Sequence, residues 1–391
     1  MSGPLEGLRI VEIAGIGPGP FCAMMLADAG ADIVRVDRLA ASGATGREGG
    51  APAGAAYAAK DFMNRNRRSI AVDLKSPLGT EIVLALVARA DGLIEGFRPG
   101  VAERLGIGPE ACKERNPRLV YGRMTGWGQS GPLCASVGHD INYIAVAGAL
   151  DAIGRCDSGP VPPLNLVGDF GGGGMLLAYG MVCALLEAAR TGLGQVVDAA
   201  MVDGAALLTT FIHGMMAMGL WSSKRGTNLL DSGAPFYDVY QTADDKYVAV
   251  GALEPQFYAA LVAAIDGDAV EVPEQMDRSR WPEMRTRFAA IFRTKTREEW
   301  CTLLEGSDAC IAPVLGLDEA PDHPHLAARA TFVEIAGERQ PAPAPRFSRT
   351  PGEVRMPPPL PGEHTAEVLD AWGVEPGLAA AARSAGALRA Q

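Results

Sequence analysis

The fold is decided by residues 8–37, LRIVEIAGIGPGPFCAMMLADAGADIVRVD. The short apolar run at 8–13 predicts a buried strand, and a Gly/Pro-rich turn follows it. Residues 21–29 predict a helix, and 31–36 predict a second strand that ends at Asp37. A strand, a helix and a second strand in this order form a βαβ unit, which joins two parallel strands.

Further units of the same kind follow in the first half of the chain. Strands are predicted at 69–74, 92–97 and 119–124 and a helix at 78–90, which indicates an α/β fold with a mostly parallel sheet. Residues 40–59, rich in Ala, Gly and Ser, predict a surface loop. A second domain is predicted from residue 225 onward, with a hairpin at 237–250 and helices at 257–265, 285–292 and 298–304. After it come a Pro-rich connector at 340–361 and a last helix at 365–372, which is expected to return to a packed surface.

Composition excludes several classes of protein. The 391 residues are 48% hydrophobic and 21% charged, as in an ordinary globular protein, and the net charge of −11 argues against a surface that binds nucleic acid. The seven cysteines are scattered without a CxxC pair, so we expect reduced thiols in the cytoplasm and no metal site. No secretory signal is recognised near Met1, and the uncharged residues 204–223 predict a buried helix, in a large core or a dimer interface, rather than a membrane span.

The turn at residues 15–20, Gly-Ile-Gly-Pro-Gly-Pro, resembles a dinucleotide fingerprint, and Asp37 supplies an acid at the end of the next strand. Pro20 replaces the third glycine, however, and Pro18 and Pro20 lack the N–H groups that would hold a pyrophosphate. A tight turn with prolines near a helix start is therefore favoured over nicotinamide or flavin binding.

Three acid/base candidates remain. His139 lies beside Asp140, and imidazole is the side chain best suited to general acid/base work near neutrality; it could equally pack at a helix entry that Asp140 caps. Asp169 precedes four glycines, where it could be a catalytic acid beside free N–H groups or only a helix cap. Glu254 is followed by Pro255 at a predicted helix start, where an acid is usually a cap.

Motifs along nearly the whole chain resemble the family III coenzyme A transferases of the CaiB/BaiF type. The shared stretches are LEGLRIVE at 5–12, GPG at 17–19, AGADIVRVDR at 29–38, DLK at 73–75, NPRLVY at 116–121, GWGQ at 126–129, GQVVD at 194–198 and PGEHT at 361–365. Within that superfamily, GHDINY at 138–143, GDFGG at 168–172 and EPQF at 254–257 are similar to the α-methylacyl-CoA racemase branch.

The resemblance implies a large Rossmann-like domain built from both ends of the chain, with a smaller α+β domain between them, in an interlocked homodimer. Residues 1–200 would begin the large domain, 225–330 would form the small one, and 331–391 would return to complete the large one. No separate cofactor is expected, since CoA is part of the substrate. The residues implied to bind CoA are Arg38, Val72, Asp73, Leu74, Lys75, Gly96, Phe97, Arg98, Arg104, Gly138, Asp140, Ile141, Asn142 and Tyr143.

The implied reaction interconverts the (2R) and (2S) epimers of a 2-methylacyl-CoA thioester through an enolate. The resemblance assigns proton transfer to His139 on one face and Asp169 on the other, with Glu254 of the partner subunit orienting His139. Backbone N–H groups near Asp169 and Gly171 would hold the enolate oxygen. Met215, Met216 and Met218 could contact the acyl chain or simply pack in the core, and the role of Cys310 is open. The alternative is a CoA-transferase in which Asp169 attacks the thioester; a noncatalytic CoA-binding protein is disfavoured.

Overall fold

The computed structural model describes residues 3–39, 55–266 and 274–389. It divides into two compact units, which are described separately. Unit 1 contains residues 1–147, 164–208 and 328–391, and unit 2 contains residues 148–163 and 209–327. Most of the surface loop predicted at 40–59 lies outside the described residues, and its last part forms the short helix α2 (Ala55–Ala58).

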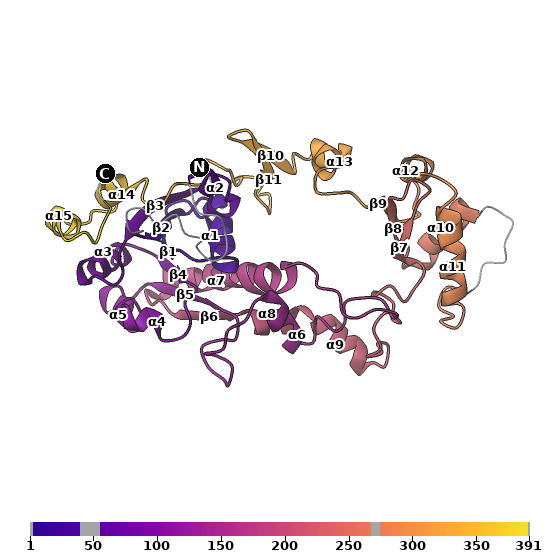
Figure 1. The fold of residues 1–391 in the computed structure, drawn as a ribbon, viewed down its shortest axis with the longest axis horizontal. Coiled ribbons are helices and arrows are strands. Elements are labelled where there is room, and N and C mark those ends of the chain that lie inside the picture. The colour runs from indigo at the N-terminus through magenta and orange to yellow at the C-terminus, as the bar shows by residue number, and fades with distance from the viewer. Residues whose placement is uncertain (1–2, 40–54, 267–273, 390–391) are drawn as a thin grey trace. The chain divides into compact units, whose positions relative to one another are not determined.

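Unit 1 is built on a six-stranded sheet in the order β3-β2-β1-β4-β5-β6 (Figure 1). All of its neighbouring strands run parallel, so the predicted α/β class is confirmed. The strands are β1 (Arg9–Ile13), β2 (Asp32–Arg38), β3 (Arg67–Val72), β4 (Gly92–Glu95), β5 (Val120–Thr125) and β6 (Val196–Ala200). Sequence analysis placed the first five within about two residues and missed β6, which the prediction left without an element.

Helices cover both faces of this sheet, because successive strand residues point to opposite sides and both sides are apolar. Ile10 and Ile33 pack with helices α1 (Pro18–Asp28) and α7 (Leu176–Thr191). Val11 and Val34 pack on the other side in a core whose helices are α3 (Pro77–Val87), α14 (Thr365–Ala371) and α15 (Pro376–Ser384). The other elements of unit 1 are η1 (Phe62–Asn64), α4 (Val101–Arg104), α5 (Pro109–Arg115), α6 (Asp140–Val146), the π-helix η2 (Leu166–Met175), α8 (Met201–Leu208), β10 (Phe332–Ile335) and β11 (Glu338–Pro341).

Unit 2 is a small α+β structure. Strands β7 (Tyr237–Gln241), β8 (Tyr247–Gly251) and β9 (Ile311–Pro313) form an antiparallel sheet, and β7 and β8 are the predicted hairpin. Its core is rich in aromatic side chains, among them Phe236 and Trp300. Its helices are α9 (Thr210–Ala217), α10 (Pro255–Asp266), α11 (Trp281–Phe292), α12 (Arg297–Leu304) and η4 (Ala320–Asp322), and α13 (Pro324–Ala328) contains the boundary with unit 1.

Residues 148–163 group with unit 2, whereas the sequence analysis included them in the large domain at 1–200. Two ion pairs explain the difference. Arg155 holds the carboxylate of Asp238 on β7 with contacts of 2.7 and 3.0 Å, and Arg225 holds Asp151 at 2.9 Å. Both pairs join residues distant in sequence, so local patterns did not reveal them.

The single helix expected over residues 204–223 is interrupted at Thr209, and its burial in a dimer interface stays a prediction. The segment divides into the end of α8 and the separate helix α9, and α9 has no buried residue. Among the described residues, one continuous helical segment, Leu166–Thr191, is long and apolar enough to cross a membrane by length and composition alone. Half of its most apolar window is buried, as in the core helix of a globular unit.

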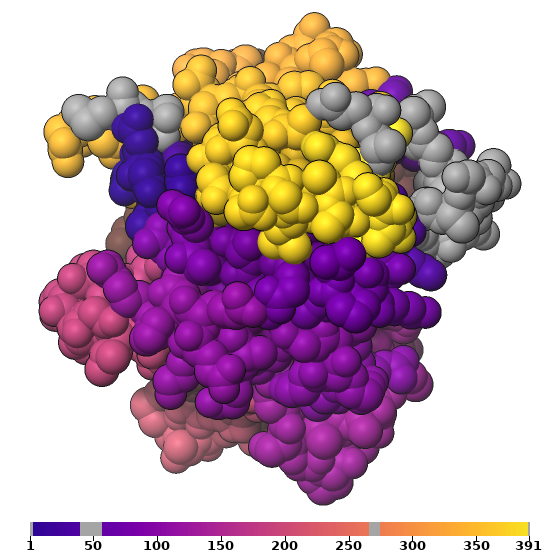
Figure 2. Space-filling model, turned by 90° about the vertical axis from the view of Figure 1, so that its left-hand side faces the viewer, coloured from indigo at the N-terminus to yellow at the C-terminus, as the bar shows by residue number. Residues whose placement is uncertain are grey.

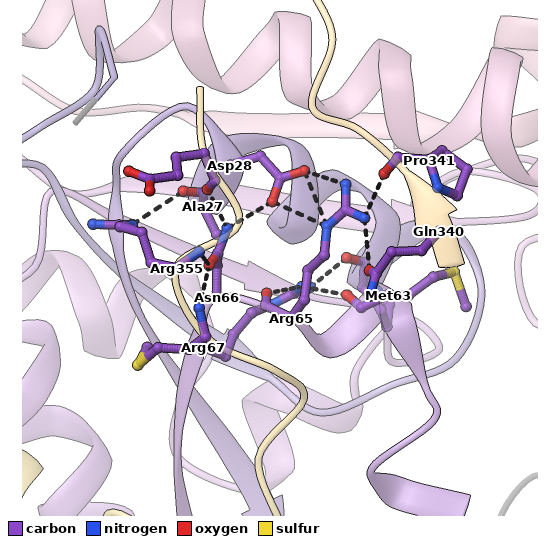
Figure 3. Close-up of polar contacts among 12 residues, drawn as sticks. Ala27, Asp28, Met63, Arg65, Asn66, Arg67, Gln340, Pro341 and Arg355 are labelled. Carbon is purple, nitrogen blue, oxygen red and sulfur yellow. Dashed lines mark hydrogen bonds and ion pairs between the residues drawn. The ribbon is translucent and has the colours of Figure 1, made fainter. Parts of the chain in front are cut away.

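The C-terminal part of the chain packs against the N-terminal part over a broad area of unit 1 (Figure 2). One polar attachment is a buried cluster around Asp28, at the end of α1 (Figure 3). Arg65 binds Asp28 at 2.6 Å and donates to Gln340 Oε1 at 2.9 Å and the Pro341 carbonyl at 2.8 Å. Asn66 donates to Asp28 at 2.8 Å and accepts from the Arg355 N–H at 2.6 Å. The cluster therefore ties three distant segments together.

Replacing Arg65 by Ala leaves the Asp28 carboxylate buried without its cation, because the two side chains are only 3% and 6% exposed. We expect this change to lower the free energy of unfolding by about 3–5 kcal/mol, measured by urea-induced unfolding. The control is Arg115→Ala, which removes an ion pair to Glu81 whose side chains are 46% and 43% exposed. It should cost less than about 1 kcal/mol. Equal losses in the two variants would contradict the importance of the cluster.

Candidate functional site

The strand order of unit 1 places a crevice at the carboxyl ends of β1 and β4. The chain winds outward from β1 to β2 and β3 on one side and from β4 to β5 and β6 on the other, which makes this a topological switch point. Ligands of open α/β sheets bind at such points because the loops leave the sheet in opposite directions there. A cavity of about 770 Å³ lies at this edge. Its lining includes residues 13–20, 94–99, 124–127 and 136–139 and Tyr143, Asn165, Asp169 and Phe170.

Asp169 is held at this cavity by close backbone contacts of η2. A Cβ on Gly172 would lie 2.7 Å from the Ala205 nitrogen, and a Cβ on Gly204 would lie 1.8 Å from the Gly172 carbonyl oxygen. A Cβ on Gly174 would lie 2.7 Å from the Pro18 carbonyl oxygen. These glycines therefore let η2 approach both α8 and α1, which is the packing role that sequence analysis weighed against substrate approach.

The carboxylate of Asp169 faces the turn after β1. Gly17 has φ +68°, a conformation that favours glycine, and a Cβ there would lie 3.4 Å from Asp169 Oδ2. Asn165 donates to the same oxygen at 3.0 Å. Burial raises the pKa of Asp169, and the charge of Asp140 raises it further, while the Asn165 hydrogen bond and the charge of His139 oppose the change. A carboxyl group with a raised pKa at a cavity is suited to accept and return a proton.

His139 lines the same cavity from the start of α6. It is the N-cap residue of that helix, and its backbone N–H donates to Asn142 Oδ1 at 3.0 Å. Its side chain is exposed. The predicted pair His139 and Asp169 thus shares one cavity, and the two charges interact.

The backbone groups predicted to hold an enolate oxygen are already engaged. The Asp169 N–H donates to Asp140 Oδ1 at 2.7 Å, so it is not free in this structure. Gly171 lies inside η2, and a π-helix pairs N–H groups with carbonyls five residues earlier. The structure therefore gives this expectation no free donor at Asp169 or Gly171.

The ring of Tyr143 lies against two glycines in the cavity wall. A Cβ on Gly126 would lie 2.1 Å from this ring and one on Gly138 would lie 2.8 Å from it. Burial raises the pKa of the Tyr143 hydroxyl, and the Asp169 charge raises it further. Of the residues implied to bind CoA, those that line this cavity are Gly96, Phe97, Arg98, Gly138 and Tyr143.

The other implied CoA residues lie outside the cavity lining. Val72 is only 1% exposed, so its side chain cannot contact a ligand, and Asp140 is 6% exposed. The Asp73 carboxylate accepts the Lys75 N–H at 3.0 Å. Ile141 and Asn142 are exposed, and Leu74 is half-buried against the core.

Four cations lie near the carboxyl edge of the sheet. Arg38 ends β2, Lys75 follows β3 and Arg98 follows β4, and Arg104 ends α4. All four are exposed, and none forms an ion pair with a carboxylate in the described part of the chain. They differ in this from Arg65 and from Arg67, which is buried with Glu12 at 3.0 Å.

Glu254 belongs to unit 2, where it is exposed between β8 and α10. Burial raises the pKa of the Cys310 thiol, and the Glu254 charge is the next cause. Within the described residues, no group of three or more His, Cys, Asp or Glu could hold a metal ion.

Sequence analysis missed two parts of the cavity. The turn at 15–20 was set aside with the dinucleotide hypothesis, yet its position after the first strand of a parallel sheet was a signal for a ligand site. Asn165, which contacts Asp169, stands four residues before it, one helical turn away.

The glycine contacts around Asp169 can be tested with Gly204→Ala. The new Cβ would overlap the Gly172 carbonyl, so we expect a loss of about 1–3 kcal/mol in the free energy of unfolding. Gly159→Ala is the control, because nothing lies within 4 Å of a Cβ there, and it should change stability by less than about 0.5 kcal/mol. Urea-induced unfolding of both variants measures this, and a neutral Gly204→Ala would contradict the packing role.

Comparisons with known proteins agree with this architecture. The chain is 48% identical to the α-methylacyl-CoA racemase of Mus musculus over 373 residues, which are 94% of this chain and 93% of that protein. It is 45% identical to the α-methylacyl-CoA racemase of Homo sapiens over the same shares. The crystal structure of a CaiB/BaiF family protein from Brucella suis has a TM-score of 0.79 and 25% identity, over 95% of this chain and all of that one. The profile of CoA-transferase family III matches residues 5–365, and the chain therefore belongs to that family.

Proposed function

We propose that this protein is an isomerase, an α-methylacyl-CoA racemase that interconverts (2R)- and (2S)-2-methylacyl-CoA thioesters. The observation that carries the proposal is that His139 and Asp169 line one cavity at the switch point of the sheet. Identity of 48% to a protein with this activity supports it. Two acid/base groups in one cavity are what a 1,1-proton transfer requires.

In the proposed reaction, a base removes the proton from C2, and the electron pair of the C–H bond moves onto the thioester oxygen as an enolate. Return of a proton to the opposite face of C2 gives the other epimer. We assign His139 to one face and Asp169 to the other, each acting as base in one direction and as acid in the reverse. No cofactor is needed, because the thioester itself delocalises the charge.

We assign Glu254 to orienting His139 from the partner subunit of a homodimer. Support comes from the exposed apolar side chains within each unit: Tyr179 and Leu186 on α7 are 70% and 60% exposed, and Phe211 on α9 is 60% exposed. Apolar patches of this kind mark protein interfaces. The Met215, Met216 and Met218 segment belongs to α9 and its C-cap, and its contact with an acyl chain remains part of the proposal.

The CoA moiety would meet the cations at the carboxyl edge of the sheet. Arg38, Lys75, Arg98 and Arg104 are exposed and available for phosphate oxygens, and Arg98 reaches the cavity itself. This arrangement explains how a chain with net charge −11 could bind a polyanionic nucleotide. The seven free cysteines support a cytoplasmic location.

The alternative is a CoA-transferase, for which family membership alone would be sufficient. In that reaction the Asp169 carboxylate attacks the thioester carbonyl, the C–S bond breaks to release the CoA thiolate, and an acyl anhydride of Asp169 remains; no second base is needed. The placement of His139 in the same cavity favours the racemase.

The test is proton NMR in deuterium oxide with one epimer of a 2-methylacyl-CoA and no free acid. We expect loss of the α-proton signal and appearance of the other epimer, with rates about 10²–10⁴-fold lower in His139→Ala and Asp169→Asn. The controls His325→Ala and Asp370→Asn should exchange at the wild-type rate.

Unchanged exchange in His139→Ala or Asp169→Asn, with CoA ester binding retained, would refute the assignment of that residue. No exchange in the wild type, combined with CoA transfer when a carboxylic acid is added, would favour the transferase.

Removal of a phosphate contact should weaken binding more than chemistry. We expect Arg98→Ala to raise KM for the acyl-CoA about tenfold with kcat changed less than about twofold, because a charge-assisted hydrogen bond contributes about 1.5–3 kcal/mol. Steady-state kinetics at two ionic strengths measures this. Added salt should reduce the difference in KM between Arg98→Ala and the wild type. Arg383→Ala is the matched control; an equal change in both variants would argue against a specific contact.

A further inference from the structure

Asp140, the first residue of α6, is buried beside the candidate site without lining its cavity. Its exposure is 6%, and its Oδ1 accepts the Asp169 N–H at 2.7 Å. Its Oδ2 is also buried and has no hydrogen-bond partner among the described residues. A buried carboxylate with an unsatisfied oxygen is costly, so its presence calls for a reason beyond packing.

The chain makes room for this carboxylate with a glycine. A Cβ on Gly168 would lie 2.5 Å from Asp140 Oδ1 and 2.9 Å from its Cγ. Any larger residue at 168 would force the carboxylate of Asp140 away from the Asp169 amide. Gly168 and Asp140 therefore depend on each other: the missing side chain of Gly168 leaves the space that the Asp140 carboxylate occupies.

We propose that Asp140 is a positioning residue for Asp169: through the space left by Gly168, its buried carboxylate holds the Asp169 backbone and places a negative charge beside the Asp169 side chain. This rests on the proposed function, since Asp169 has a chemical role only there. The burial of Asp140 and its bond to the Asp169 amide favour this role over the one in CoA binding that the resemblance implies.

The charge of Asp140 has a defined effect on proton transfer. It disfavours the ionised form of Asp169 and so raises the pKa of that side chain, in addition to the larger effect of burial. An increase of one unit in the pKa makes the carboxylate a tenfold stronger base. A catalytic carboxylate that must remove a weakly acidic C–H proton gains from this.

Few other charged groups face Asp169. The start of α6 contributes His139, whose charge acts in the opposite direction, and Tyr143. Arg98 lines the same cavity, as does Glu95, which is buried and paired with Arg123. The elements packed on η2 add no other charged cavity-lining residue: α1 has none before Asp28, α7 none before Glu187, α8 only the exposed Asp203, and β5 and β6 only Arg123 and Asp198, which do not line the cavity.

The main experiment compares Asp140→Asn with the wild type. Asn keeps an acceptor oxygen for the Asp169 N–H but removes the charge, so we expect the acidic limb of the kcat/KM profile to move about 0.5–1 pH unit lower. We expect kcat to fall about tenfold while KM changes less than about twofold. The control Asp370→Asn removes an exposed carboxylate on α14 and should leave the limb in place.

A limb that does not move in Asp140→Asn would overturn the proposal. A raised KM with unchanged kcat would do the same and would return Asp140 to ligand binding.

A double-mutant cycle with Gly168→Ala and Asp140→Ala tests whether the two residues act through the same interaction. Each single change should displace or remove the carboxylate and lower kcat by a similar factor. The double variant should lose little more than either single variant, because the same interaction is removed only once. Multiplicative losses would contradict the coupling.

A titration of the free protein separates this proposal from the racemase itself. With carbon-13 at the side-chain carboxyls of aspartate, the Asp169 signal is assigned by its absence in Asp169→Asn, and its pKa is followed by NMR. We expect that pKa to fall in Asp140→Asn whether or not the enzyme racemises any thioester. An unchanged titration would overturn the positioning role, whereas a lowered pKa without α-proton exchange would refute the proposed function and leave Asp140 as assigned.

Discussion

The arrangement of the candidate site depends on one steric constraint, the approach of η2 to α8 and α1 without intervening side chains. The Gly204 Cα and the Gly172 carbonyl are so close that a Cβ would overlap the oxygen at 1.8 Å. Because the two backbones are in direct contact, with no flexible side chain between them, the π-helix has a single position on unit 1. Because Asp169 is the fourth residue of that helix, its place opposite Gly17 follows from the same contact.

A second level of organisation is electrostatic. Buried arginines in unit 1 are paired, as Arg65 is with Asp28 and Arg67 with Glu12, and they connect segments that are far apart in sequence. Arginines at the carboxyl edge of the sheet, such as Arg38 and Arg98, are exposed and unpaired with described carboxylates. Arginine therefore has two roles in unit 1. Buried arginines hold distant segments together, and exposed arginines at the edge of the sheet are available to bind an anion.

Most strands of the sheet could be predicted from the sequence, because a parallel strand is a short apolar run between turns. Residues 8–13 and 31–36 have that pattern. The sequence also predicted His139 and Asp169 as site residues, because their motifs resemble a known branch of the family. It did not predict that residues 148–163 belong to unit 2, since that depends on the distant pair Arg155 and Asp238. The contact between Asp140 and the Asp169 amide was equally hidden, since only the three-dimensional fold shows it.

The order of segments along the chain has a consequence for synthesis on the ribosome. The face of the sheet that carries α3 is covered by α14 and α15, and the Val72 backbone pairs with Leu388, three residues before the last one. Domains generally fold as units during translation, from the N-terminus onward. Here the first strands and α3 emerge early, yet their apolar face is not fully covered until the whole of unit 2 and the return segment have been made. The nascent protein therefore carries an unfinished hydrophobic core through most of its own synthesis.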